Sequence, residues 1–357
     1  MKEEKYLQCN HSTISNMSQR QLIRNIMNRE PAERCGFWLG NPLPETIQVY
    51  NQKIGTSSLE EIQQFLGDDI RWITPQYIKS TYNHPEGKSL RPWKEANPMW
   101  LANGPMSHIE TVEEVEAYDW PQIKYLDFTE TINQLQNLGD YYRLSGFWSP
   151  FFHDLTYMLG TEDLLMKMYT HPDVIHAILN RLCGFYLEAN DLFYQQAGNL
   201  IDAHFMGNDF GSQGDLLMSH ELFGEFYLPW LKKFADQAHH YGYHSVLHCC
   251  GSIYRIVDQL IESGIDCIHP IQALATNMNA EYLAKNFKGR IIFMGGVDTQ
   301  HLLPEGTPDV VRDETKRIIN LLGPGLIVGP SHEALMPNVP IENVIAIAKD
   351  VRNKQTN

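Results

Sequence analysis

The chain has no long apolar run, and this absence excludes a membrane-spanning helix. None of its 357 residues belongs to a stretch that approaches the roughly 20 apolar residues such a helix needs. The opening residues, MKEEKYLQCNHST, also lack the apolar stretch of a secretory signal. We therefore expect a cytoplasmic protein that has no membrane partner.

Basic residues are scarce relative to acidic ones. Lys and Arg number 28 against 43 Asp and Glu, which gives a formal net charge of −15. Nucleic acids and anionic membranes are bound through clustered cations, so this balance argues against both kinds of partner. A small anionic substrate that a few local arginines hold stays compatible with the composition.

Cysteines and nucleotide-binding glycine motifs are also scarce or missing. Six cysteines are too few, in a chain of this length, for the disulfide scaffold of a small secreted protein, so we expect them to be reduced. Neither G-x-G-x-x-G nor G-x-x-x-x-G-K-[ST] opens a predicted helix, which disfavours dinucleotide and nucleotide binding.

The second half of the chain alternates between short apolar runs and amphipathic helical patterns. Five strands are predicted, each followed by a helix, over residues 199–206, 244–250, 266–271, 290–294 and 325–328. Repeated β-then-α units indicate a parallel sheet with crossover helices.

The first half adds three weaker strand candidates, at residues 35–39, 70–73 and 142–147. Eight units favour a (β/α)₈ barrel over an open sheet. We predict one barrel domain over residues 1–357, with 1–30 as a helical lead-in and 75–135 as a long irregular insertion.

An H-x-C pair, His248 and Cys250, ends the predicted strand 244–250. Residues two apart share a face of a strand, so the imidazole and the thiol should point the same way. Both are preferred zinc ligands. Such a pair alone is weak, because cysteine often packs as a small hydrophobe, but its position at a strand end favours a function.

Other strands are also flanked by chemically useful side chains. In a barrel of this kind the active site lies at the carboxyl ends of the strands, so these residues should converge on one face. They are Asp68 and Asp69, Asn208 and Asp209, His269 and Gln272, Asp298, and Ser331, His332 and Glu333.

Several of these residues also have a structural interpretation. Asp69 follows a glycine-containing turn and is compatible with a cap, and Asp209 is compatible with an Asx-turn. His269 could be a core histidine that a backbone group satisfies. Asp298, after two glycines, could be a helix cap. Cys249 should face away from its neighbours and pack in the core.

Three segments resemble the uroporphyrinogen decarboxylase superfamily: HCCGSIYRIVDQLIESGIDCIHPIQ, FMGGVDTQHLLPEGTPDVV and GPSHEALMPNVPIENV. The likeness is strongest from residue 202 to 351, and it implies a (β/α)₈ barrel. The decarboxylase branch implies metal-free chemistry with arginines near the N-terminus and an aspartate at the second strand. The methyltransferase branch implies zinc, held by H-x-C and a later cysteine, and methyl transfer between a corrinoid and a thiol.

This sequence is closer to the methyltransferase branch. It has the H-x-C pair, and it lacks the arginine-rich R-Q-A-G-R-Y segment of the decarboxylases; the matching ERCGFWLGNP keeps only Arg34. The third zinc ligand of the methyltransferases corresponds to Glu333 and the late histidine of the decarboxylases to His332. No cysteine follows Cys267, so the resemblance leaves Glu333 or His332 as the third ligand.

We therefore predict an enzyme that transfers a methyl group between a corrinoid, free or carried by a corrinoid protein, and a thiol-type small molecule. Zinc would be held by His248, Cys250 and Glu333. The predicted catalytic residues are Asp209, Asp298, His332 and Asp69, and the predicted substrate-binding residues are Arg34, His269, Gln272 and Asn208.

Two alternatives stay open on the sequence. The first is a metal-free carboxy-lyase for a porphyrinogen, which would use Asp69, His332 and Arg34. The second is a non-catalytic protein that binds a corrinoid or another tetrapyrrole at the barrel mouth.

Overall fold

The computed structural model describes residues 17–97 and 103–352. Eight strands in these residues form one parallel sheet in the order β1-β8-β7-β6-β5-β4-β3-β2. Their bounds are β1 Gly36–Phe37, β2 Ile70–Trp72, β3 Tyr142–Ser145, β4 Ala203–Gly207, β5 His244–His248, β6 Cys267–Ile271, β7 Ile292–Val297 and β8 Leu326–Pro330. The predicted (β/α)₈ barrel is confirmed.

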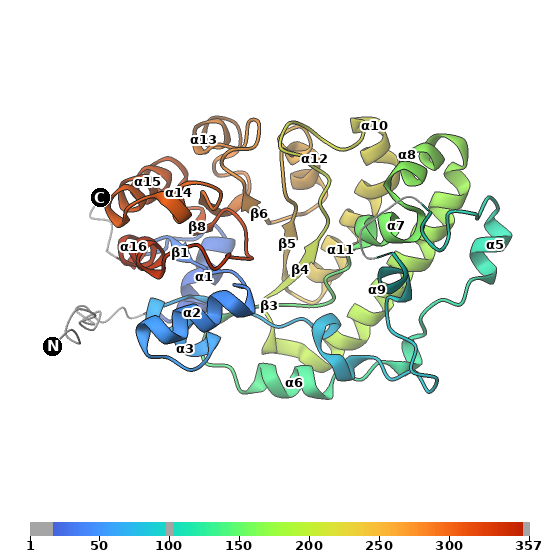
Figure 1. The fold of residues 1–357 in the computed structure, drawn as a ribbon, viewed down its shortest axis with the longest axis horizontal. Helices are drawn as coiled ribbons and strands as arrows, with labels where there is room; N and C mark the ends of the chain where they lie inside the picture. The colour runs from blue at the N-terminus through green and yellow to red at the C-terminus, as the bar shows by residue number, and fades with distance from the viewer. Residues whose placement is uncertain (1–16, 98–102, 353–357) are drawn as a thin grey trace.

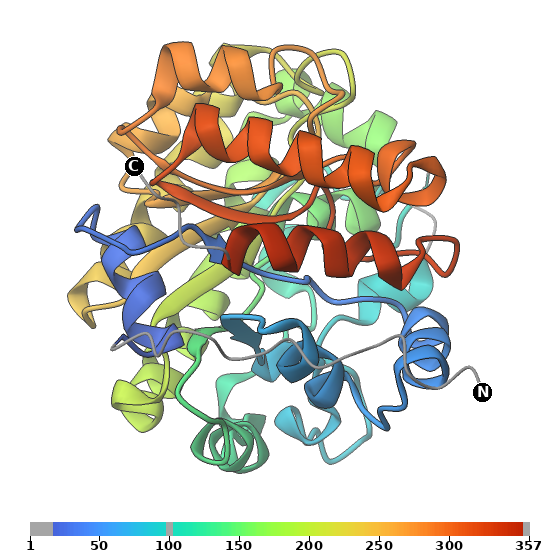
Figure 2. The same cartoon turned by 90° about the vertical axis from the view of Figure 1, so that its left-hand side faces the viewer.

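Helices connect the strands and cover the outside of the barrel (Figures 1 and 2). In Figure 2 the long helices α15 and α16 lie side by side over the sheet. The helices are α1 Gln19–Met27, α2 Pro44–Ile54, α3 Leu59–Leu66, α4 Pro92–Ala96, α5 Val112–Ala117, α6 Thr129–Gln136, α7 Phe151–Leu159, α8 Thr161–Thr170, α9 Pro172–Ala197, α10 His220–Leu222, α11 Leu228–His240, α12 Val257–Glu262, α13 Ala280–Phe287, α14 Leu302–Glu305, α15 Pro308–Leu322 and α16 Ile341–Arg352.

Alternation along the strands separates two apolar cores. Val246 of β5 and Cys267 of β6 belong to the cluster inside the barrel, whereas Leu247 and Ile268 pack outward against the helices. Residues two apart share a face, so His248 and His269 follow Val246 and Cys267 into the barrel interior. The strand pattern thereby aims two histidines at the carboxyl end of the barrel.

Helix α1 closes the opposite, amino-terminal end of the barrel. Its apolar side buries Leu22, Ile23, Ile26 and Met27 in the interior cluster. The predicted helical lead-in over residues 1–30 is thus present from Gln19, and its residues 1–16 lie outside the described residues. Ser18 caps the helix by accepting a hydrogen bond from the Gln21 backbone N–H.

The described residues between 75 and 135 form only short elements, namely α4, α5, the start of α6 and the 3₁₀ turns Pro75–Tyr77, Lys79–Thr81 and Ile123–Tyr125. Within this segment, residues 98–102 lie outside the described residues. The division of the chain into a single domain stays a prediction.

One predicted pair of strand-end residues lies at the wrong end of the barrel. Asp68 and Asp69 precede β2, so chain direction places them at its amino end. The Asp69 backbone N–H donates to the Phe37 carbonyl over 3.0 Å, and the Phe37 N–H donates to Asp69 Oδ2 over 2.8 Å. Asp69 therefore links β1 to β2 and helps to close the barrel, and the expectation that it lies at the mouth is wrong.

No helix among the described residues is both long and apolar enough to cross a membrane.

Candidate metal and active site

Two histidines from neighbouring strands meet at the carboxyl end of the barrel. His248 ends β5 and is paired in register with His269 of β6. Their Nδ1 atoms lie 3.0 Å apart, which is a hydrogen-bond length. Both rings are buried, and Trp148 and Phe205 pack beside His248. This packing fixes the orientation of the His248 imidazole.

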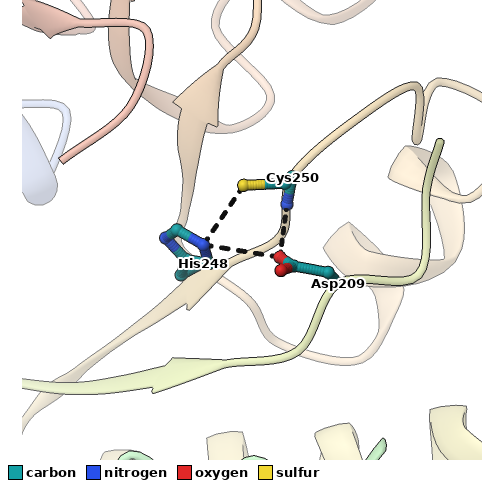
Figure 3. Close-up of side chains that lie close together, drawn as sticks. All are labelled: Asp209, His248 and Cys250. Atoms are coloured by element: carbon teal, nitrogen blue, oxygen red, sulfur yellow. Dashed lines mark hydrogen bonds and ion pairs between the residues drawn. The ribbon is translucent and has the colours of Figure 1, made fainter. Parts of the chain in front are cut away.

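The other ring nitrogen of His248 faces a thiol and a carboxylate. Nε2 lies 3.3 Å from Cys250 Sγ and 3.4 Å from Asp209 Oδ1 (Figure 3). The Cys250 backbone N–H donates to the same Asp209 oxygen over 2.8 Å. Asp209, His248 and Cys250 thus form a group whose donor atoms lie within 4.8 Å of one another.

Close contact between two loops places Asp209 beside Cys250. A Cβ on Gly251, whose φ is +85°, would lie 2.5 Å from the Gly211 backbone, so neither a left-handed backbone nor this approach suits another residue. The Ser252 N–H donates to the Ser212 carbonyl over 2.7 Å. The glycines after β4 and β5 therefore hold the two loops together.

Glu333, from the loop after β8, lies on the Nδ1 side of His248. Its Oε2 is 3.4 Å from His248 Nδ1 and 3.4 Å from His332 Nδ1. That oxygen is buried and accepts no hydrogen bond from the described residues. Together with His269, these atoms form a second group that could hold a metal ion.

His332 is more exposed than its neighbours. Its ring centroid lies 6.1 Å from that of His248, and its Nδ1 accepts the Ala334 backbone N–H over 3.0 Å. The side chain lines a cavity of about 350 Å³ beside the two metal-competent groups. The cavity is also lined by Gln272, Leu274, Asp298, Thr299, Ser331 and Met336.

Gln272 and Asp298 line this cavity, but both are committed to backbone groups. Gln272 Oε1 accepts the Gly251 N–H over 3.0 Å and a bond from Gln213 Nε2. The Asp298 carboxylate accepts the backbone N–H groups of Gln300, His301 and Leu302 at the start of α14. The structural interpretation of Asp298 as a cap therefore describes its contacts.

Two other predicted site residues are structural in their contacts. Asn208 is fully buried; its Oδ1 accepts the Phe152 N–H and its Nδ2 donates to the Ser149 carbonyl, so it braces the loop after β3. Arg34 forms a two-pronged ion pair with Asp69, both contacts 2.8 Å, before β1. The structure does not bring Arg34 or Asp69 to the carboxyl end with His248.

His153, on α7, is a site residue that the sequence analysis missed. Its Nε2 lies 3.2 Å from Asp209 Oδ2. The residue is 56 positions from Asp209 and sits in an aromatic-rich helix, so no local spacing marks it. Only the packing of α7 against the loop after β4 brings the two together.

The ionisable side chains of the site have pKa values that shift in different directions. Burial lowers the pKa of His248, but Glu333, Cys250 and Asp209 outweigh it and raise that pKa well above its usual range. Burial would raise the pKa of Asp209, but hydrogen bonds from His153 and His248 outweigh it and hold that pKa well below its usual range. Burial and the charge of His248 lower the pKa of His269. Asp209 is therefore an anion and His269 a neutral ring.

The two thiols of the motif have different surroundings. Burial raises the pKa of Cys250, and the neighbouring His248 opposes this shift. Cys249 is fully buried, faces away, and accepts the Phe210 N–H at its sulfur, so the predicted packing role of Cys249 agrees with its contacts.

The chain matches the family model described as uroporphyrinogen decarboxylase (URO-D) over residues 94–354. It belongs to this family. The match includes every strand from β3 to β8 and all the residues of both metal-competent groups.

Curated relatives of this chain are methyltransferases. A methylated-thiol–coenzyme M methyltransferase of Methanosarcina mazei is 24% identical over 163 residues, which are 46% of this chain and 41% of the relative. A methylcobamide:CoM methyltransferase of the same organism is 26% identical over 192 residues, 52% of each chain. The chain thus matches about half the length of these relatives.

A solved methyltransferase structure from Methanosarcina mazei has the same fold. The TM-score is 0.67 at 15% sequence identity, and the likeness covers 94% of this chain and 98% of that one. At this identity the comparison bears on the fold alone.

Proposed function

We propose that the protein is a zinc-dependent methyltransferase that moves a methyl group between a corrinoid and a thiol-type small molecule. The observation that carries the proposal is the donor set at the mouth, where His248 Nε2, Cys250 Sγ and a carboxylate oxygen lie within 4.8 Å of one another. The relatives named as methylcobamide and methylated-thiol methyltransferases support the substrate classes.

The donors fit zinc by their chemistry. Imidazole nitrogen, thiolate sulfur and carboxylate oxygen are the ligands that zinc uses in proteins. Glu333 Oε2 is a buried carboxylate oxygen without a hydrogen-bond donor among the described residues, and such an oxygen needs a cation or a proton nearby. His248 and Cys250 would hold the ion, with Asp209 and Glu333 as nearby carboxylates.

When bound, zinc would supply a thiolate, because coordination deprotonates a thiol whose free pKa lies near 8.5. The corrinoid would carry the methyl group, either free or on a corrinoid protein. The residues of this chain bind and orient: His332, Ser331 and Thr299 present polar groups to the cavity, and Met336 and Leu274 give it apolar walls. His153 would keep Asp209 in place.

The carboxy-lyase alternative has less support. Two of the three residues it would use, Arg34 and Asp69, are paired with each other at the amino end of the barrel. Only His332 remains at the carboxyl end, and no described arginine lines the cavity beside it.

The test is metal analysis joined to a methyl-transfer assay with methylcobalamin and a simple thiol. We expect about one zinc per chain and thiol methylation that a strong chelator stops. Cys250→Ser should lose both, and Cys249→Ser should keep the zinc. Chelator-resistant decarboxylation of a porphyrinogen, or a folded protein that holds no zinc and methylates no thiol, would refute the proposal.

A further inference from the structure

We infer that the carboxylate that completes the metal site is Asp209, from the loop after β4, and that Glu333 instead stays outside the ligand set, as a charge partner on the Nδ1 side of His248. This inference rests on the proposed function, because it assigns roles around the same ion. It differs from the ligand set that the sequence analysis predicted, in which Glu333 is the third ligand.

The two metal-competent groups use opposite nitrogens of one imidazole. Nε2 of His248 faces Cys250 and Asp209, and Nδ1 faces His269 and Glu333. A neutral imidazole has one nitrogen with a lone pair and one with a proton. A metal on one side therefore fixes the proton on the other side, and the two groups have different roles.

Separations between donor atoms favour the Nε2 side as the metal side. Zinc bond lengths of about 2.1 Å to nitrogen or oxygen and about 2.3 Å to sulfur, in a tetrahedral site, separate N and O donors by about 3.4 Å and N and S donors by about 3.6 Å. The structure has 3.4 Å from His248 Nε2 to Asp209 Oδ1 and 3.3 Å to Cys250 Sγ. On the other side Glu333 Oε2 is also 3.4 Å from His248 Nδ1, but the two imidazole nitrogens are only 3.0 Å apart, which suits a hydrogen bond better than two ligands of one ion.

Accessibility points the same way. A catalytic zinc keeps one position open for substrate. The Asp209 side chain is 33% exposed and Cys250 is half-buried, so this group is reached from the mouth. His269 is 1% exposed and the Glu333 side chain 16%, so the second group offers little room for a substrate thiol.

Charge and positioning complete the case for Asp209. With the Cys250 thiolate, the Asp209 anion would give two negative charges against the two positive charges of zinc. The carboxylate is preset for this role, because the Cys250 N–H holds Oδ1 over 2.8 Å and His153 holds Oδ2 over 3.2 Å. Figure 3 shows the carboxylate turned toward His248 and Cys250.

Glu333 then has the role of an outer carboxylate. A histidine that binds zinc through one nitrogen commonly donates the proton on the other to a carboxylate, which fixes the ring and its tautomer. Glu333 Oε2 lies 3.4 Å from His248 Nδ1, on the side away from Cys250, which it shares with His269, the hydrogen-bond partner of that nitrogen at 3.0 Å. Its position after β8 suits orientation of the ring rather than contact with the sulfur.

The experiment compares isosteric carboxylate-to-amide variants of the full chain by zinc content after dialysis and by zinc affinity in competition with a chromogenic chelator. Asp209→Asn should lose zinc, with affinity weakened by more than about 100-fold, the upper range for residues outside the ligand shell. Glu333→Gln should keep one zinc per chain, with affinity weakened by about 10–100-fold. Asp215→Asn, in the same loop and exposed against Arg255, is the matched control and should bind like wild type.

A cobalt-substituted series keeps the test decisive if Asp209→Asn folds poorly. Wild type should give a thiolate-to-cobalt absorption band, and Asp209→Cys should strengthen it by adding a second sulfur. A folded Asp209→Cys protein without a stronger band overturns the inference. So does zinc that survives Asp209→Asn but not Glu333→Gln, or zinc that depends on His269 and not on Cys250. Wild type without zinc overturns the proposed function as well, which distinguishes the two failures.

Discussion

The two ends of the barrel differ in how completely their charged side chains are paired. At the amino end, Asp69 is bound by Arg34, and Asp202 accepts hydrogen bonds from Arg20, Arg24 and the backbone of β3. At the carboxyl end, a buried oxygen of Glu333 has no hydrogen-bond donor among the described residues. Charges with complete sets of partners stabilise a fold, whereas incomplete sets mark the place where a ligand supplies what is missing.

This contrast explains why the aspartates have different meanings. Asp69 and Asp202 precede their strands and are almost fully buried against arginines of α1 and the segment before β1. Asp209 follows its strand, is partly exposed, and faces an imidazole and a thiol. In this fold, a carboxylate at the amino end of a strand stabilises the barrel, whereas one at the carboxyl end lies where the active site is expected.

The largest effect should follow from breaking a pair at the amino end. Asp69→Ala leaves the largely buried Arg34 without its carboxylate partner and frees the Phe37 N–H, so we expect the free energy of unfolding to fall by about 3–5 kcal/mol. Urea unfolding of the purified variant measures this loss. Zinc content per folded chain should be unchanged.

The control is an exposed pair. Asp236→Ala removes the contact with Lys232, both side chains being 57% exposed, and should cost less than about 1 kcal/mol. If Asp69→Ala is as stable as wild type but loses its zinc or its activity, Asp69 belongs to the functional site and the contrast between the ends is wrong.

A second prediction uses a histidine of the barrel wall between the two ends. His204 is fully buried, its Nε2 bonds to the Phe147 carbonyl, and its Nδ1 has no hydrogen-bond partner in the described part of the chain. Burial lowers its pKa to about 4. The pKa of His204 in the folded state lies below its value of about 6.5 in the unfolded chain, so protonation favours the unfolded chain. The stability of the fold is therefore unaffected above pH 6.5 and falls as the pH drops toward 4, by up to about 3 kcal/mol.

The measurement is the difference in unfolding free energy between wild type and His204→Gln at several pH values from 7 to 4.5. The carboxylates titrate in both proteins, so the difference isolates the histidine. Wild type should lose more stability on acidification than the variant. Equal losses would show that His204 is not held neutral by burial.

The fold was largely predictable because alternation in the strands is a local signal. Residues 244–250 and 266–271 were placed within two residues of β5 and β6. The first strand was overestimated: β1 spans only Gly36–Phe37, since the Asp69 side chain, rather than a neighbouring strand, accepts the Phe37 N–H. No sequence pattern predicts that a side chain, rather than the backbone of a neighbouring strand, accepts this hydrogen bond.

The site was predictable where its residues share a strand, as His248 and Cys250 do. Asp68 and Asp69 were misplaced because closeness to a strand was weighed without chain direction, although both precede the apolar run. Asp298 has a cap role that depends on a short helix, α14, which the pattern did not reveal. The partners of Asp209 and Glu333 come from other strands and from α7, and such contacts exist only after folding.

The smallest expected effect is at the carboxyl end, in the metal-free protein. Glu333→Gln removes a charge whose Oε2 accepts no hydrogen bond from the described residues, so no such bond is broken at that atom. The variant gives up the attraction to protonated His248, and it also relieves the cost of a buried charge; these opposing terms leave a net change of no more than about 1 kcal/mol. Urea unfolding in the presence of a chelator measures it. A loss of 3 kcal/mol or more, about that expected for Asp69→Ala, would mean that Glu333 is a structural carboxylate like Asp69. The carboxylates at both ends of the barrel would then stabilise the fold. A variant nearly as stable as wild type would instead agree with a role of Glu333 in the charge and orientation of His248.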